Sequence, residues 1–144
     1  MIQIKTGGFT MLGHYLMFNR NCEEAIKTYE KAFNGTITEM RKYSDMPPNP
    51  AFPIPEENKN LVLHARLQID GMEIMCADSS EKSTKGNNMY VSITTKDEAL
   101  VKGAWDLLKQ EGEVYMELSP SFFAALHGSL QDKYGVNWMF TALK

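Results

Sequence analysis

Three histidines carry most of the reactive chemistry that the sequence offers, and two of them stand in segments that alternate like strands. His14 opens one such segment, and His64 lies on the polar side of another. An imidazole can bind a divalent metal, act as a general acid or base, or hydrogen-bond a ligand from a cavity wall. His14 and His64 could pair with Glu73 for the first two roles. Because no spacing demands that pairing, we favour the hydrogen-bonding role.

Arg66 and His127 have simpler interpretations. Arg66 stands on the same polar side as His64, where its guanidinium could clamp an anionic ligand through two parallel hydrogen bonds. The alternative is a solvated or salt-bridged arginine, and the sequence leaves both open. His127 lies near the hairpin that closes the chain, and we expect it to be a structural or surface residue.

Motifs for other chemistries are missing from the sequence. It holds no G-x-S-x-G, no C-x-x-C and no glycine-rich phosphate loop. The two cysteines, Cys22 and Cys76, each fall in an apolar pattern, which indicates buried reduced thiols rather than a disulfide. Cys22 stands near the start of a predicted helix, where a thiol pKa can be lowered, but its apolar surroundings favour burial.

A strand, a capped helix and a second strand position His14. His14–Asn19 alternates like a strand, and Asn21 with Glu24 predicts an N-cap and capping box. Asn34-Gly35 ends the helix, with Gly35 expected at positive φ. Thr36–Tyr43 is then an expected edge strand. The apolar stripe of the helix comprises Cys22, Ala25, Ile26, Tyr29, Ala32 and Phe33.

A hairpin positions His64. Leu61–Ala77 alternates around Asp70-Gly71, a dipeptide typical of a tight turn. We expect Leu63, Ala65, Leu67 and Ile69 to contact the helices. His64, Arg66, Gln68, Glu73 and Met75 should then face the opposite side. Five prolines fill residues 44–58, which predicts a lid or a solvated connector before this hairpin.

The second half of the chain repeats this plan. The alternation of Asn88–Thr95 predicts a strand. Thr95 and Glu98 then have the spacing of a capping box, and Gly112 is expected to end the helix that follows. The strand Glu113–Leu118 and a closing hairpin follow. We therefore predict one domain over residues 1–144, with module one at about 12–78, a linker at 79–87 and module two at about 88–142. Residues 1–11 are expected to form a loose arm or an edge strand.

Composition sets the broad class. The chain has 144 residues and a formal net charge of −3, with acidic and basic residues interspersed, so we expect no nucleic-acid or membrane partner. No stretch approaches the roughly 20 apolar residues of a membrane span, and no signal core opens the chain, which makes the cytoplasm the expected compartment. The ten methionines indicate either an adaptable core or an adaptable cavity.

The chain resembles a known superfamily. The spacing H-x14-Y from His14 to Tyr29 resembles the opening of the glyoxalase/bleomycin-resistance (vicinal oxygen chelate) superfamily. The segments YLMFNRNCEEAIKTYEKAF, HARLQIDGMEIMCADS and FFAALHGSLQDKYGVNWMF are similar to its PhnB-like branch. The resemblance implies an α+β fold of two βαβββ modules whose curved mixed sheets enclose a cleft. It also implies a homodimer, in which modules pair within a chain or swap between chains.

The resemblance also implies where a metal would bind. Metal-dependent members of the superfamily place one ligand on each of four strands, which here correspond to His14, about Met75, about Asn88 and about Met139. Only His14 is a suitable ligand for the oxygen chemistry of the superfamily. We therefore expect no metal and no other cofactor. PhnB-like proteins are also labelled demethylubiquinone methyltransferases, but no glycine-rich nucleotide-binding turn follows a strand here, so we do not expect methyl transfer.

These observations predict a metal-free binding protein for a small, partly apolar molecule. The alternative is an enzyme of the same superfamily, of the lyase, isomerase or dioxygenase type, that uses a metal or histidine acid–base chemistry. A purely structural or partner-binding dimer is a third possibility. The residues expected to line the cleft are His14, Phe18, His64, Arg66, Met75, Tyr90, Phe123 and Met139.

Overall fold

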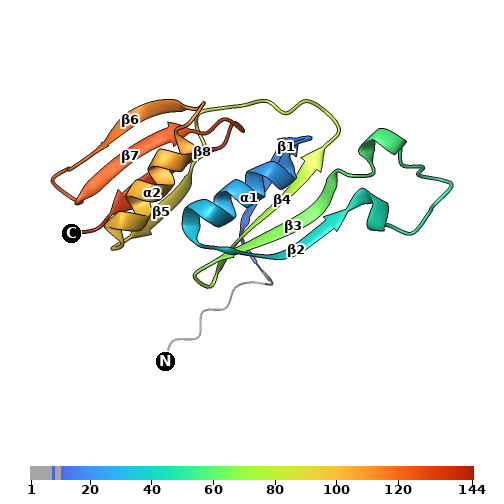
Figure 1. The fold of residues 1–144 in the computed structure, drawn as a ribbon, viewed down its shortest axis with the longest axis horizontal. Coiled ribbons are helices and arrows are strands. Elements are labelled where there is room, and N and C mark those ends of the chain that lie inside the picture. Colours follow the sequence, from blue (N-terminus) through green and yellow to red (C-terminus); the bar gives the residue numbers. More distant parts are fainter. Residues whose placement is uncertain (1–7, 9–10) are drawn as a thin grey trace.

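A computed structural model describes Gly8 and residues 11–144, so the expected N-terminal arm lies almost wholly outside the described residues. The predicted fold class is confirmed: the chain forms two four-stranded mixed sheets and two helices (Figure 1). Module one comprises β1 (His14–Asn19), α1 (Cys22–Phe33), β2 (Thr36–Lys42), β3 (Val62–Ile69) and β4 (Met72–Ser79). Module two comprises β5 (Val91–Thr95), α2 (Glu98–Leu108), β6 (Glu113–Ser119), β7 (Leu126–Gln131) and β8 (Asn137–Ala142).

The two sheets have equivalent topologies. Their strand orders are β1-β4-β3-β2 and β5-β8-β7-β6, and in each the first strand runs parallel to its neighbour while the other pairs are antiparallel. The predicted hairpin turn is present between β3 and β4, with Asp70 at φ 47° and Gly71 at φ 78°. Two short 3-10 helices, η1 (Tyr43–Asp45) and η2 (Glu56–Asn58), flank the proline-rich segment.

One core joins the two modules. Helix α1 packs on the first sheet, and its Tyr29 and Phe33 also contact Trp138 of β8, with ring centroids 5.0 and 5.1 Å apart. Helices α1 and α2 contact each other. The helix-covered sides of both sheets therefore share a single apolar core, and the other side of each sheet points away from it. The two sheets are separate and do not close on each other within this chain.

The helix starts differ from the predicted caps. Asn21 makes no side-chain cap; instead the buried carboxylate of Asp78 on β4 accepts from the backbone N–H groups of Cys22 and Val62, both at 2.9 Å. At α2 the N-cap is Asp97, whose side chain accepts from Leu100 N at 3.0 Å, in place of Thr95. Local spacing could not reveal Asp78, because that carboxylate comes from a strand far along the chain.

The end of α1 also differs from the prediction. Asn34, at φ 51°, takes the left-handed position that we expected of Gly35. Gly35 meets a different constraint, because a Cβ there would lie 2.9 Å from both the Gln68 carbonyl oxygen and the Leu67 side chain. The glycine is therefore needed for close approach of the chain to β3.

The register of β3 follows the prediction except at its start. Ala65 and Leu67 lie in the core and Ile69 packs against it, while His64 and Arg66 face the other side. Leu63 is not in the core, and Val62 takes that place. A bulge against β2 explains the difference, since Arg41 pairs with His64 but Lys42 pairs with Val62.

Candidate functional site: the uncovered faces of the two sheets

The side of the first sheet that faces away from the helices carries three of the eight residues predicted to line the cleft, namely His64, Arg66 and Met75. Arg66 pairs across the sheet with Met75, and Met75 pairs with Tyr15 of β1, so these three side chains share one side. We call this surface face A. Its residues are Tyr15, Met17, Glu39, His64, Arg66, Glu73 and Met75.

A hydrogen-bonded network crosses face A. The Tyr15 hydroxyl lies 2.8 Å from His64 Nδ1, and the two rings stack with centroids 5.6 Å apart. His64 Nε2 lies 3.8 Å from Glu39 Oε2. Arg66 donates from Nε to Glu39 Oε2 at 2.9 Å and from a terminal nitrogen to Glu73 Oε1 at 2.8 Å. Of the two interpretations of Arg66, the structure supports the salt-bridged one.

The charges of face A are balanced locally. Arg41 Nε also contacts Glu39 Oε1, at 2.7 Å. Desolvation alone would raise the pKa of Glu39, but the hydrogen bonds and charges of Arg41 and Arg66, with the nearby His64, together lower it. Glu39 is therefore a carboxylate held by two guanidinium groups. Desolvation, followed by smaller charge effects, raises the pKa of Tyr15, which keeps its hydroxyl protonated at neutral pH.

Two predicted site residues do not lie on face A. Phe18 is 1% exposed and packs in the core against Tyr29 and Tyr134, so its expected place in the cleft is wrong. His14 alternates in phase with Leu16 and Phe18 on the helix side, although it is exposed at the start of β1. A Cβ on the preceding residue, Gly13, would lie 3.6 Å from the Met75 methyl group. The strand thus directs Gly13 and Tyr15, rather than His14, toward Met75.

The remaining predicted residues lie in module two. Met139 pairs with Ser92 and Ser129, and it alternates with the buried Trp138 and Phe140, which puts it on the uncovered side. The Tyr90 ring contacts Tyr115, whose hydroxyl donates to Asn137 Oδ1 at 3.0 Å. Phe123 packs on the ring of His127, 4.9 Å between centroids. We call this surface face B. Its residues are Tyr90, Tyr115, Phe123, His127, Asn137, Met139 and Thr141.

Sequence analysis missed Tyr15 and Glu39, which the network places at its centre. Tyr15 directly follows His14, and its alternation with Leu16 and Phe18 is the sequence signal that places it on face A. Glu39 was assigned to an edge strand without a partner. Only the pairing of β2 with β3, which sets Glu39 opposite Arg66, shows its role.

The residues at the four superfamily positions do not fit a metal. His14 points to the other side of the sheet from Met75, and the fourth position, Met139, offers a thioether. Within the described part of the chain, no group of three or more His, Cys, Asp or Glu side chains could hold an ion.

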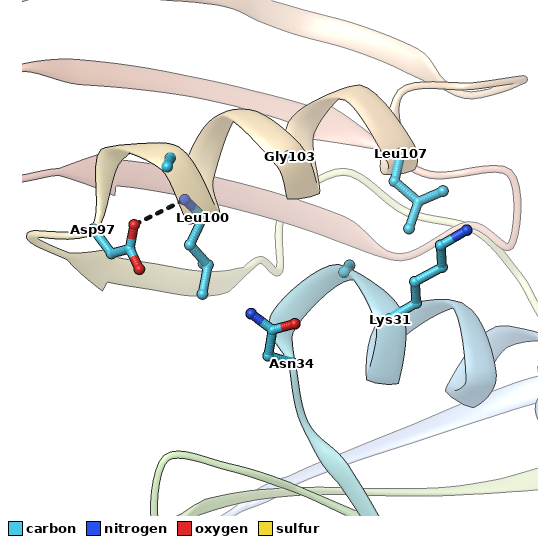
Figure 2. Close-up of a pocket in the computed structure, with 8 residues that line it drawn as sticks. Lys31, Asn34, Asp97, Leu100, Gly103 and Leu107 are labelled. Carbon is cyan, nitrogen blue, oxygen red and sulfur yellow. Dashed lines mark hydrogen bonds between the residues drawn. The ribbon is translucent and has the colours of Figure 1, made fainter.

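A groove on the helix side forms a separate feature (Figure 2). It has a volume of about 410 Å³ and lies where the end of α1 meets the start of α2. Lys31 and Asn34 line it from α1, while Leu100 and Gly103 line it from α2. The Asp97 carboxylate at its rim is already occupied by the N–H of Leu100. None of the predicted site residues lines this groove.

No helix among residues 11–144 is long and apolar enough to cross a membrane.

The comparisons with known proteins agree on one family. A crystal structure of protein PA1353 from Pseudomonas aeruginosa is similar, with 29% identity, coverage of 92% of this chain and 97% of that one, and a TM-score of 0.79. A PhnB protein from Bacillus cereus, described as a putative 3-demethylubiquinone-9 3-methyltransferase, has 29% identity, coverage of 92% and 98%, and a TM-score of 0.75.

A more distant likeness extends this to the superfamily fold. The fosfomycin resistance protein FosX from Listeria monocytogenes, solved with Mn(II) and a dihydroxypropylphosphonic acid, has 9% identity, coverage of 94% of each chain and a TM-score of 0.63. At that identity it shares the fold alone. The profile of the 3-demethylubiquinone-9 3-methyltransferase family matches residues 11–141. The chain therefore belongs to that family.

Proposed function

We propose that this protein binds a small, partly apolar molecule on face A without a metal ion. One observation carries the proposal: a hydrogen-bonded polar network lies beside apolar groups that the chain itself leaves uncovered. Tyr15 is 46% exposed and Met17 is 50% exposed, although both stand in a regular strand beside Met75. A surface that combines exposed apolar area with a few fixed polar groups has the composition of a ligand site.

We further propose that a second copy of the chain covers face A. Both sheets have an uncovered face and exposed edge strands, which proteins commonly bury by association. A homodimer that brings face B of one copy against face A of the other would add Met139, Tyr90 and Phe123 to the site. Light scattering should then give the mass of a dimer at micromolar concentration, and a monomer would count against this arrangement.

The alternative function is an enzyme of the same superfamily. The pairing of His64 with Tyr15 favours its acid–base form, because a hydrogen-bonded imidazole can move a proton. A metal-dependent form has no such support. Elemental analysis separates the two, since about one equivalent of zinc, nickel, manganese or iron per chain would favour the metal enzyme.

Methyl transfer, which the family description names, is not proposed for this chain, because the sequence holds no glycine-rich turn suited to a nucleotide-like methyl donor. The cytoplasm remains the proposed compartment, consistent with two free buried thiols, Cys22 and Cys76. We propose no nucleic-acid and no membrane partner, because the net charge is −3 and no basic run occurs.

Binding of a fluorescent apolar probe tests the proposal. We expect anilinonaphthalene sulfonate to bind the folded protein saturably. Met17→Asp should weaken that binding at least about tenfold, because it puts a negative charge on face A that repels the sulfonate and removes an apolar side chain. Met72→Asp is the matched control, since Met72 is 66% exposed at the far end of the β3–β4 hairpin. Equal binding by both variants and the wild type, with unchanged folding, would refute a ligand site on face A.

A further inference from the structure

The network on face A joins three groups that together can relay a proton. Tyr15 comes from β1, His64 from β3 and Glu39 from β2, so three strands hold them. The Tyr15 hydroxyl lies 2.8 Å from His64 Nδ1, within hydrogen-bond range. His64 Nε2 lies 3.8 Å from Glu39 Oε2, which is too long for a hydrogen bond but close enough for an electrostatic interaction.

Glu39 determines which ring nitrogen carries the proton. Its two oxygens are held by Arg41 at 2.7 Å and by Arg66 at 2.9 Å, which fixes an anionic carboxylate beside Nε2. A carboxylate favours N–H over a lone pair on the nitrogen that faces it. Neutral His64 therefore carries its proton on Nε2, and Nδ1 accepts the hydrogen bond from Tyr15.

This arrangement leaves the Tyr15 oxygen with lone pairs directed away from His64. Among the residues described, His64 is the one hydrogen-bond partner of that hydroxyl, and nearly half of the side chain is exposed. A ligand group that meets Tyr15 on this face must therefore donate a hydrogen bond to it. We propose that Tyr15, His64 and Glu39 form a proton relay that takes the proton of an acidic hydroxyl, such as a phenol or an enol, on the bound ligand.

The step balances without a further reactant. The ligand O–H bond breaks and its proton goes to the Tyr15 oxygen, while the Tyr15 proton passes to His64 Nδ1. The products are a ligand oxyanion and an imidazolium, with the tyrosine restored to its neutral form. The imidazolium then lies between that oxyanion and the Glu39 carboxylate, so its charge is stabilised on both sides. The inference rests on the proposed function, because it specifies which molecules face A binds.

Arg66 limits the ligand class further. Both of its hydrogen-bonded arms are engaged, by Glu39 and by Glu73, so it is not a free clamp for a carboxylate or phosphate. A ligand that arrives as an anion therefore gains little binding energy from Arg66. A neutral hydroxyl that ionises on face A is instead stabilised, as its oxyanion, by the imidazolium of His64 formed in the same step. Met17, which is 50% exposed, supplies apolar surface on the same face as Tyr15, while Met75 beside Tyr15 is buried. A small phenol with an apolar ring combines both requirements.

The tautomer of His64 can be measured without any ligand. The chain has three histidines, so nitrogen-15 spectra of the ring nitrogens can be assigned by His14→Gln and His127→Gln variants. In the neutral imidazole of His64 we expect the proton on Nε2, with the Nδ1 resonance shifted in Tyr15→Phe and unchanged in the control Tyr43→Phe. A proton found on Nδ1 of neutral His64 would overturn the relay.

4-Nitrophenol tests the ligand class, because its anion absorbs near 400 nm. We expect the wild type to bind it with the ionisation equilibrium shifted at least about tenfold toward the anion, and Tyr15→Phe and His64→Gln to lose that shift. Ionisation that persists in Tyr15→Phe would overturn the proposal, and so would absence of nitrophenol binding. If anilinonaphthalene sulfonate still binds in either case, the relay fails while the proposed function stands.

Discussion

Two clusters in this molecule combine a tyrosine with a carboxylate, yet their surroundings differ. In the core, Asp132 accepts from Tyr29 Oη at 2.6 Å, Trp138 Nε1 at 2.9 Å and two backbone N–H groups. On face A, the Tyr15 hydroxyl has one hydrogen-bond partner among the described residues, His64, and its lone pairs remain open. A cluster that is buried and fully hydrogen-bonded holds the modules together, whereas one that is half exposed and incomplete is available to a ligand.

The largest expected effect follows from deleting the core carboxylate. Asp132 is 3% exposed, so Asp132→Ala leaves four donors without this acceptor, three of them in buried hydrogen bonds, including the Tyr29 hydroxyl that ties α1 to module two. We expect a loss of about 3–5 kcal/mol in the free energy of unfolding, measured with urea. Asp106→Ala, at a side chain that is 70% exposed, should change it by less than about 0.5 kcal/mol. Equal losses of unfolding free energy in Asp132→Ala and Asp106→Ala would mean that the buried cluster does not stabilise the fold more than an exposed carboxylate does, and would remove the distinction drawn between the clusters.

The pH dependence of the same carboxylate gives a smaller effect. Burial raises the pKa of Asp132 above its ordinary value of 3.8, although its four hydrogen bonds oppose that change. The folded state then binds the proton more tightly than the unfolded state, so this group's contribution to stability falls as pH rises from about 3.8 through the folded-state pKa.

Asp132→Asn does not titrate and should lack that decline. The difference in unfolding free energy between wild type and Asp132→Asn should therefore favour the wild type more at low pH than at pH 7. Urea titrations of both proteins across this range check the sign. A difference that grows with pH would mean that the hydrogen bonds outweigh burial.

Tyr15→Phe should have little effect on stability. The hydrogen bond to His64 is solvent-accessible and the phenyl ring keeps the stacking, so we expect a change of less than about 1 kcal/mol in the unfolding free energy. Thermal unfolding of Tyr15→Phe beside Tyr29→Phe gives the comparison. A destabilisation by Tyr15→Phe as large as that of Tyr29→Phe would indicate that face A is a structural element.

The smallest effect is expected at an exposed ion pair outside both clusters. Hydrogen bonds from Lys27 and then Lys42 lower the pKa of Glu23 to about 2. Its contribution is therefore present above an ordinary pKa of about 4.5 and is lost as pH falls toward 2. Because Glu23 is 40% exposed, solvent screening limits the loss in Glu23→Gln to below about 1 kcal/mol at pH 7, as urea titration can check. A loss that persists unchanged at pH 2 would contradict this cause.

Local sequence patterns predicted the helices and strands well, because alternation and apolar periodicity follow directly from which side chains are buried. The turn at Asp70-Gly71 and the apolar stripe of α1 depend only on neighbouring residues in this way. The Asp78 cap and the Asp132 cluster depend on contacts across the fold, so spacing gave no signal for them.

Strand alternation correctly predicted which side chains share a sheet face where the alternation was unambiguous, and it failed at the start of β1. His64, Arg66 and Met75 share a face as expected. His14 was assigned to that face through a family spacing, but β1 directs Tyr15 there instead. A shift of one residue moves a side chain to the other side of a sheet, so a histidine at a strand start is easily misplaced.

The central claim is that face A, and not the helix-side groove, receives the ligand. Selective labelling of the methionine methyl groups tests it most directly, because Met17 and Met75 lie on face A and Met72 and Met46 lie elsewhere. On titration with 4-nitrophenol we expect saturable shifts of the Met17 and Met75 resonances, with Met72 and Met46 unchanged. Saturation that leaves Met17 and Met75 unshifted would contradict the account.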